Sequence, residues 1–149
     1  MKILIIEDDH LKYNILYKFL NESFKNISIV WEKSYHSGLV QVFEHTYDLV
    51  LLDMSMPIYE EIGSKSGGNF ETYAGRLILE EMELYNLSTK VIVVTGYDVY
   101  DDGKSLSILK SELRNSYGDF YLDVIYFVSK DEHWKKELLT IIEANFKLD

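Results

Sequence analysis

Two short apolar runs in the chain each lead directly into acidic residues. Residues 3–6 (Ile-Leu-Ile-Ile) are followed by three acids at 7–9, and residues 49–52 (Leu-Val-Leu-Leu) are followed by Asp53. Such short continuous apolar runs are typical of parallel strands that are buried on both faces. In an open parallel sheet, ligands bind beyond the carboxyl ends of the strands. If these two strands are neighbours, their carboxylates therefore meet at one site; taken alone, Asp53 could equally end its strand in an ordinary turn.

The acids that would meet there, Glu7, Asp8 and Asp53, predict a metal site and a nucleophile. Carboxylates roughly 5 Å apart repel by roughly 3 kcal/mol per pair at an effective dielectric constant near 20, so without a cation some would bind protons. Oxygen ligands suit Mg²⁺, which completes its shell with water and phosphate oxygens. A carboxylate can also attack phosphorus to give an aspartyl-phosphate. The pattern therefore indicates Mg²⁺-dependent phosphoryl transfer to an aspartate.

Two further strand ends carry groups that could neutralise a phosphoryl group. Thr95 ends the apolar run at 90–95, and Lys130 follows the run at 122–128. Alone, a threonine at a strand end and a surface lysine are both ordinary. In combination with the acids, the hydroxyl and the ammonium are the groups that phosphoryl transfer needs for charge neutralisation.

These residues must be positioned by an alternating series of elements. Strands are expected at residues 2–7, 27–31, 48–53, 90–95 and 122–128, and helices at about 9–22, 35–46, 72–86, 104–116 and 131–147. In the first helix we expect Leu11, Ile15 and Phe19 to lie at helical spacing with Leu16 and Leu20. Strands that alternate with helices predict a parallel sheet with right-handed crossovers. The polar, glycine-bearing segment 58–74 and the segment 96–103 are predicted to be loops.

Length and composition narrow the classes of function. The 149 residues predict a single domain, 1–149, with no room for an output domain. A net charge of −10 opposes binding to a phosphate backbone, so no nucleic-acid partner is expected. The chain has no cysteine, no signal-peptide pattern and no apolar run long enough to span a membrane, and this predicts a cytoplasmic protein without a membrane partner.

Four motifs together resemble the receiver domain of two-component response regulators. They are residues 3–9 (ILIIEDD), 51–57 (LLDMSMP), 93–96 (VVTG) and 128–130 (VSK). The resemblance covers nearly the whole chain. It implies an α/β, doubly wound, flavodoxin-like (βα)5 fold with a five-stranded parallel sheet of strand order 2-1-3-4-5.

The resemblance also implies roles for the residues that match the motifs. Asp53 is implied to be the phosphoacceptor, phosphorylated by a histidine kinase or a phosphotransfer protein. Mg²⁺ is implied to bind Asp8, Asp53 and the backbone carbonyl of Ser55, with Glu7 acting through water. The chain would then be a signalling switch that contacts a downstream protein, and it would not be a separate metabolic enzyme.

On the phosphoryl side, the resemblance implies that Thr95 and Lys130 bind the phosphoryl oxygens. Phe127 falls at the position of the family's switch aromatic residue, which acts with Thr95, although a buried strand residue is an equally good interpretation. The chain departs from the family's pattern at residue 131, where Asp131 replaces the proline that usually follows the lysine. It also carries insertions at 58–74 and 96–121.

Two other functions fit parts of the pattern. A receiver-like adaptor that binds a partner without being phosphorylated is favoured by the insertions and by Asp131, but the intact acids argue against it. A haloacid-dehalogenase-type phosphohydrolase needs a second aspartate two residues after the nucleophile, and Ser55 occupies that position. Because the loops 58–74 and 96–103 leave strands just beyond Asp53 and Thr95, we expect them to border the site and to recognise a partner.

Overall fold

A five-stranded parallel sheet forms the centre of the molecule, which a computed structural model describes for residues 1–60 and 68–148. The spatial order of its strands is β2-β1-β3-β6-β7, which is the predicted order 2-1-3-4-5 when these five strands are numbered along the chain. The strands are β1 (Lys2–Ile6), β2 (Ser28–Glu32), β3 (Leu49–Leu52), β6 (Lys90–Thr95) and β7 (Tyr121–Tyr126). The predicted doubly wound α/β fold is confirmed.

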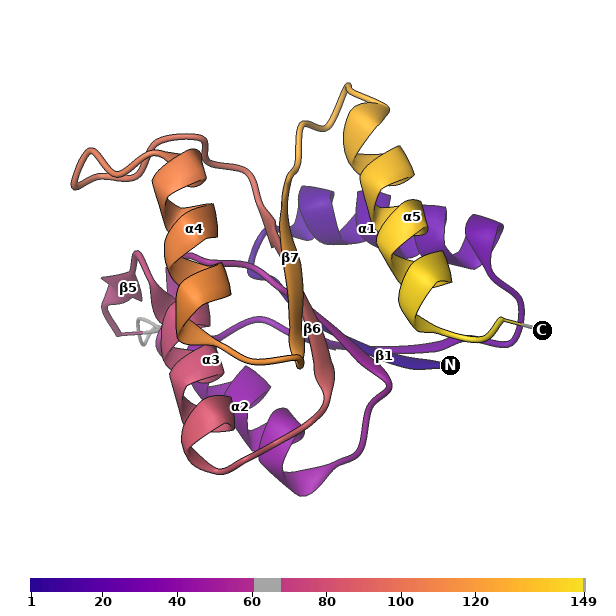
Figure 1. The fold of residues 1–149 in the computed structure, drawn as a ribbon, viewed down its shortest axis with the longest axis horizontal. Coiled ribbons are helices and arrows are strands. Elements are labelled where there is room, and N and C mark those ends of the chain that lie inside the picture. The colour runs from indigo at the N-terminus through magenta and orange to yellow at the C-terminus, as the bar shows by residue number, and fades with distance from the viewer. Residues whose placement is uncertain (61–67, 149) are drawn as a thin grey trace.

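Helices cover both faces of the sheet (Figure 1). One face carries α1 (His10–Ser23) and α5 (His133–Asn145), and the other carries α2 (Tyr35–Glu44), α3 (Ala74–Leu84) and α4 (Leu106–Ser116). Each face has its own apolar core, because successive side chains of a strand point to opposite faces. None of the helices within residues 1–60 and 68–148 has the length and apolar character needed to cross a membrane.

The strands β1 and β3 lie side by side at the centre of the sheet. Their residues pair in register from Ile3 with Leu49 to Ile6 with Leu52. All four residues of β3 are buried, as the continuous apolar run predicts. The pairing continues one step past the strands, where the N–H of Asp53 donates to the carbonyl of Ile6 (3.0 Å). The two acidic strand ends therefore emerge next to each other.

Helix α1 begins immediately after the acids. The Asp9 side chain is its N-cap and accepts hydrogen bonds from the N–H groups of Leu11 (2.8 Å) and Lys12 (3.2 Å). The buried face of the helix consists of Lys12, Leu16 and Leu20. Of the residues expected at helical spacing, Leu16 and Leu20 belong to the buried face, whereas Leu11 is 65% exposed and lies outside it.

The insertion at 58–74 is bounded by a small antiparallel pair. Strands β4 (Met56–Pro57) and β5 (Phe70–Glu71) pair with each other. β4 lies just before the predicted loop and β5 lies within it, and residues 61–67 of that loop lie outside the described part. Strands of two residues leave no alternating pattern to detect. Helix α3 starts three residues after β5, and the N–H of Gly75 donates to the carbonyl of Met54 (2.9 Å). The insertion therefore leaves and rejoins the fold beside Asp53.

Candidate functional site

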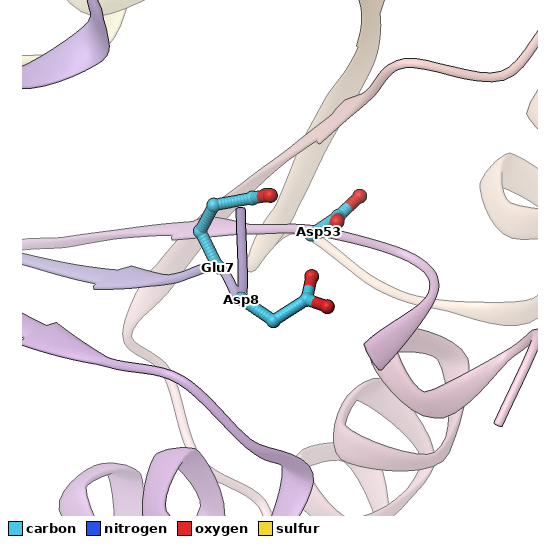
Figure 2. A group of neighbouring side chains, drawn as sticks. All are labelled: Glu7, Asp8 and Asp53. Atoms are coloured by element: carbon cyan, nitrogen blue, oxygen red, sulfur yellow. The ribbon is translucent and has the colours of Figure 1, made fainter. Parts of the chain in front are cut away.

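Three carboxyl groups meet at the ends of β1 and β3 (Figure 2). Glu7, Asp8 and Asp53 each offer an oxygen, and these oxygens lie within 4.8 Å of one another. Glu7 and Asp53 are buried, and Asp8 is partly buried. The neighbouring register of β1 and β3 produces this cluster, as the sequence predicted from the two acidic strand ends.

A lysine that the sequence analysis did not select completes the cluster. The buried Lys12 side chain extends from the first turn of α1, and its Nζ lies 2.8 Å from Glu7 Oε2 and 3.1 Å from Asp53 Oδ1. It also donates to the backbone carbonyl of Val94, at the end of β6 (2.6 Å). The three N–H groups of the ammonium thus meet three acceptors, one from the end of each central strand.

Burial and mutual charge shift the titration of these groups. Burial raises the pKa of Glu7 to about 9; Asp53 adds to the rise, and the Lys12 ammonium only partly opposes it. Burial also raises the pKa of Asp8 to about 6, with a further contribution from the charge of Asp53. Burial works against the charged form of Lys12, but Asp53 and Glu7 outweigh it and raise its pKa. The single positive charge of Lys12 therefore does not offset the negative charge that Glu7, Asp8 and Asp53 would carry together.

The cluster lies in a pocket of about 310 Å³. Its walls include side chains from both segments that were expected to border the site: Phe70, on β5, and Tyr97, just after β6. Ser55 also lines the pocket, and its hydroxyl donates to the carbonyl of Thr72 (2.6 Å). The pocket has room for a phosphoryl group, and the two predicted loops do reach its edge.

The Thr95 hydroxyl is engaged by a tyrosine rather than by the acids. Thr95 Oγ1 lies 2.7 Å from the hydroxyl of Tyr100 and accepts the N–H of Tyr97 (3.2 Å). Tyr100 is buried, and its ring packs against those of Tyr73 and Tyr97, with centroids 5.3 Å and 5.8 Å away. Burial raises the pKa of Tyr100 to about 12, so this phenol keeps its proton at neutral pH.

Phe127 and Lys130, the two predicted site residues near the end of β7, differ in burial: the first is buried and the second is exposed. Phe127 is buried, with its ring 4.9 Å from that of Trp134 and its centroid 5.8 Å from Lys12 Nζ. Lys130 is exposed in a turn and forms no ion pair with Glu7, Asp8 or Asp53 in the described part of the chain. The structure thus brings Glu7, Asp8 and Asp53 together, keeps Thr95 one strand away, and leaves Lys130 outside the cluster; the phosphoryl-binding role of Lys130 stays a prediction.

The burial of Lys12 was indicated in the sequence by its spacing from two apolar residues of the same helix. Residues 12, 16 and 20 follow an i, i+4 spacing, and this spacing places Lys12 at the head of the buried stripe of α1. Lys12 also lies one turn after Asp8, at the end of the helix nearest the acids. Tyr100 had no comparable signal, because it lies in a connection without regular periodicity.

In chemical terms, the site combines a carboxylate that can act as a nucleophile with groups that can neutralise charge. The carboxylate of Asp53 is fixed by the N–H of Met54 (2.8 Å to Oδ1) and by Lys12. Asp8 lies beside it and lines the pocket, and among residues 1–60 and 68–148 it forms no ion pair with Lys12. The arrangement can accept an electrophilic phosphorus next to a cation.

Comparison with known proteins finds response regulators among the similar chains. No protein-family model matches the sequence. The chain is 29% identical over 144 residues to the Detocs response regulatory protein DtcB of Enterobacter cloacae, covering 93% of this chain and 96% of that one.

Two solved structures show how closely the fold agrees. The phosphorylated cyanobacterial phytochrome response regulator RcpA superposes with a TM-score of 0.66 at 15% identity, over 99% of this chain and 96% of its own. The response regulator TrrA of Thermotoga maritima, in complex with Mg²⁺-BeF, gives a TM-score of 0.59 at 20% identity, over 94% and 97%. At these identities the likeness establishes the fold.

Proposed function

We propose, from the receiver-domain fold that this chain shares with response regulators, that it is a phosphoacceptor signalling switch. In this proposal Asp53 receives a phosphoryl group from a histidine kinase or a phosphotransfer protein in an Mg²⁺-dependent reaction. The signal then passes to a downstream protein through contacts between the two proteins. The curated relative DtcB, itself described as a response regulatory protein, agrees with a regulatory role rather than a metabolic one.

One observation carries the proposal: Asp53 lies at the end of a central strand, in contact with a buried ammonium and beside two further acids. The Asp53–Lys12 distance is 3.1 Å, and the cluster opens into a pocket. A merely structural aspartate at a strand end has no need of such neighbours, because burying like charges together is costly. Phosphoryl transfer, in contrast, requires a positioned nucleophile and groups that neutralise charge.

The acids present fit a divalent cation. Three ionised carboxylates and one ammonium would carry a formal charge of −2, which Mg²⁺ would cancel; without a cation, the pKa of Glu7, raised to about 9, keeps a proton on that group at neutral pH. The carboxyl oxygens lie within 4.8 Å of one another, and carboxylate oxygens are ligands that suit Mg²⁺. Asp8, Asp53 and the Ser55 carbonyl would hold the ion, with Glu7 acting through water. When bound, it would offset the negative charge of the incoming phosphoryl group.

The residues of the chain divide the chemistry among them. A carboxylate oxygen of Asp53 forms the bond to phosphorus while the bond to the donor breaks, and the electron pair of that bond leaves with the donor group. The N–H of Met54 and the ammonium of Lys12 hold the Asp53 carboxylate in place during the attack. Thr95 would reach the phosphoryl oxygens after leaving Tyr100, and this exchange couples the site to the β6–α4 connection.

The intact mass of the protein after incubation with acetyl phosphate and Mg²⁺ tests this proposal. We expect one added phosphoryl group on the wild-type protein, none on Asp53→Asn, and none on the wild-type protein when EDTA removes the metal. Asp123→Asn, which changes an aspartate near the middle of β7, is the matched control and should be labelled like the wild type. A wild-type protein that stays unmodified while an ordinary receiver is labelled would contradict the proposal and favour the adaptor without phosphorylation.

A further inference from the structure

We propose that Lys12, on α1, supplies the ammonium that binds the phosphoryl group on Asp53, in the role that the sequence motif assigns to Lys130. The inference rests on the proposed phosphoacceptor function and adds a catalytic residue to it. It starts from the position of one buried side chain that carries a charge.

The ammonium of Lys12 already contacts the reacting group. Its Nζ lies 3.1 Å from Asp53 Oδ1, so a phosphorus atom bonded to this carboxylate carries its oxygens into the neighbourhood of the ammonium. The other two contacts, to Glu7 Oε2 and the Val94 carbonyl, hold the amine in place from two other strands. An amine held in this way needs only to turn one N–H from the carboxylate to a phosphoryl oxygen.

The burial of Lys12 argues that the position has a use. Lys12 is 6% exposed, and taking an ammonium out of water is strongly unfavourable unless charged partners surround it. An apolar residue there would continue the stripe of Leu16 and Leu20 without that cost, but would leave the acids without a cation from the chain. The helix cap at Asp9 fixes the turn from which Lys12 reaches the cluster.

Lys130 has none of these properties. It lies in the turn between β7, which ends at Tyr126, and α5, which begins at His133, and it is exposed. The buried ring of Phe127, near the start of this turn in the sequence, has its centroid 5.8 Å from the Lys12 ammonium and packs on Trp134. One ammonium suffices for the proposed role, and the described structure places that of Lys12 at the site.

In the proposed step, Lys12 neutralises charge and transfers no proton. An Asp53 oxygen bonds to phosphorus, the donor departs with the electron pair of its own bond to phosphorus, and the ammonium keeps all three hydrogens. Its contribution is greatest where negative charge develops on the phosphoryl oxygens. Removing one such preorganised donor typically slows an enzyme roughly 10²- to 10³-fold.

Initial rates of labelling by acetyl phosphate with Mg²⁺, followed by intact mass, test the inference. We expect Lys130→Met to be labelled at the wild-type rate, and Lys12→Met to be labelled roughly 10²-fold more slowly. Affinity for beryllofluoride with Mg²⁺, measured by tryptophan fluorescence, should fall for Lys12→Met and stay unchanged for Lys130→Met. A lysine with a purely structural role would not change the affinity of a folded variant for this phosphoryl mimic.

The uncompensated acids could prevent Lys12→Met from folding, which circular dichroism would reveal. The double variant Glu7→Gln with Lys12→Met removes one charge of each sign, and it is compared with Glu7→Gln alone under the same conditions. Labelling of folded Lys12 variants within twofold of their controls, or loss of labelling in Lys130→Met, overturns the inference while leaving the phosphoacceptor function intact. A wild-type protein that is not labelled overturns both.

Discussion

The floor and the rim of the pocket are built in opposite ways. The floor, which we define as Glu7, Asp8, Lys12 and Asp53, consists of charged side chains that are mostly buried and contact one another. The rim, defined as Phe70 and Tyr97, consists of aromatic side chains that are 56% and 50% exposed. Because buried charges tolerate little displacement, the floor is suited to chemistry. Because the rim side chains are about half exposed, we expect changes there to disturb the fold little.

The difference predicts that the largest effect will follow from a methyl group placed beneath the floor. In Gly75→Ala the new Cβ would lie 2.3 Å from the carbonyl oxygen of Asp53 and 3.0 Å from the Cα of Met54. The hydrogen bond from the Gly75 N–H to Met54 ties the two segments together, so neither can easily retreat. Overpacking of this kind costs about 1–3 kcal/mol, which corresponds to a melting temperature lower by roughly 2–12 °C.

Thermal unfolding followed by circular dichroism measures this effect. Gly118→Ala is the matched control, because a Cβ at Gly118 meets no atom within 4 Å. The remaining folded Gly75→Ala protein should also be labelled by acetyl phosphate more slowly than the control, since the Asp53 backbone must shift. Equal melting temperatures for the two variants would show that the floor is more adaptable than its contacts indicate.

A smaller effect is expected between floor and rim, where Tyr100 holds the Thr95 hydroxyl at 2.7 Å. Tyr100→Phe removes this bond, and the loss should lower the stability by about 0.5–1.5 kcal/mol. Thr95 would then reach the phosphoryl group without first losing its bond to Tyr100, so that labelling by acetyl phosphate becomes roughly fivefold faster, the equivalent of about 1 kcal/mol.

Initial labelling rates check this prediction, with Tyr73→Phe as the control. The Tyr73 hydroxyl donates to the exposed Asp102 and, among residues 1–60 and 68–148, forms no hydrogen bond with Thr95, so its removal should leave the labelling rate unchanged. Slower labelling of Tyr100→Phe would mean that Tyr100 positions Thr95 for the reaction rather than holding it back.

The contrast between floor and rim also explains which parts of the site could be predicted from the sequence. The fold and the acids of the floor follow from continuous apolar runs that end in carboxylates, because such runs identify buried parallel strands and their ends together. Lys12 was missed because lysine is read as part of a helix's exposed face, while its burial depends on acids contributed by other strands. The side of a helix that a charge faces is decided by tertiary contacts as well as by periodicity.

Prediction was weakest where the chain leaves regular elements. The pair of β4 and β5 has two residues per strand, too few for a period, and Tyr100 lies in the connection after β6, where sequence gives no orientation. The prediction that the two insertions border the site is confirmed by Phe70 and Tyr97 in the pocket wall. Their proposed role in recognition stays a prediction.

The smallest effect on the molecule itself is expected at the rim. Replacing Phe70 and Tyr97 together by serine removes side chains that are half exposed, and such surface changes usually alter stability by no more than about 0.5 kcal/mol. Acetyl phosphate is small enough to reach Asp53 without touching the rim, so its labelling rate should stay within twofold of the wild type. Transfer from a histidine-phosphorylated protein, which must dock around the pocket, should be slower.

Leu84→Ser is the control, because Leu84 is exposed at the last residue of α3 and does not line the pocket. If the serine variant loses both reactions equally, the rim shapes the floor, and the two regions are not independent; if it loses neither, the partner docks elsewhere.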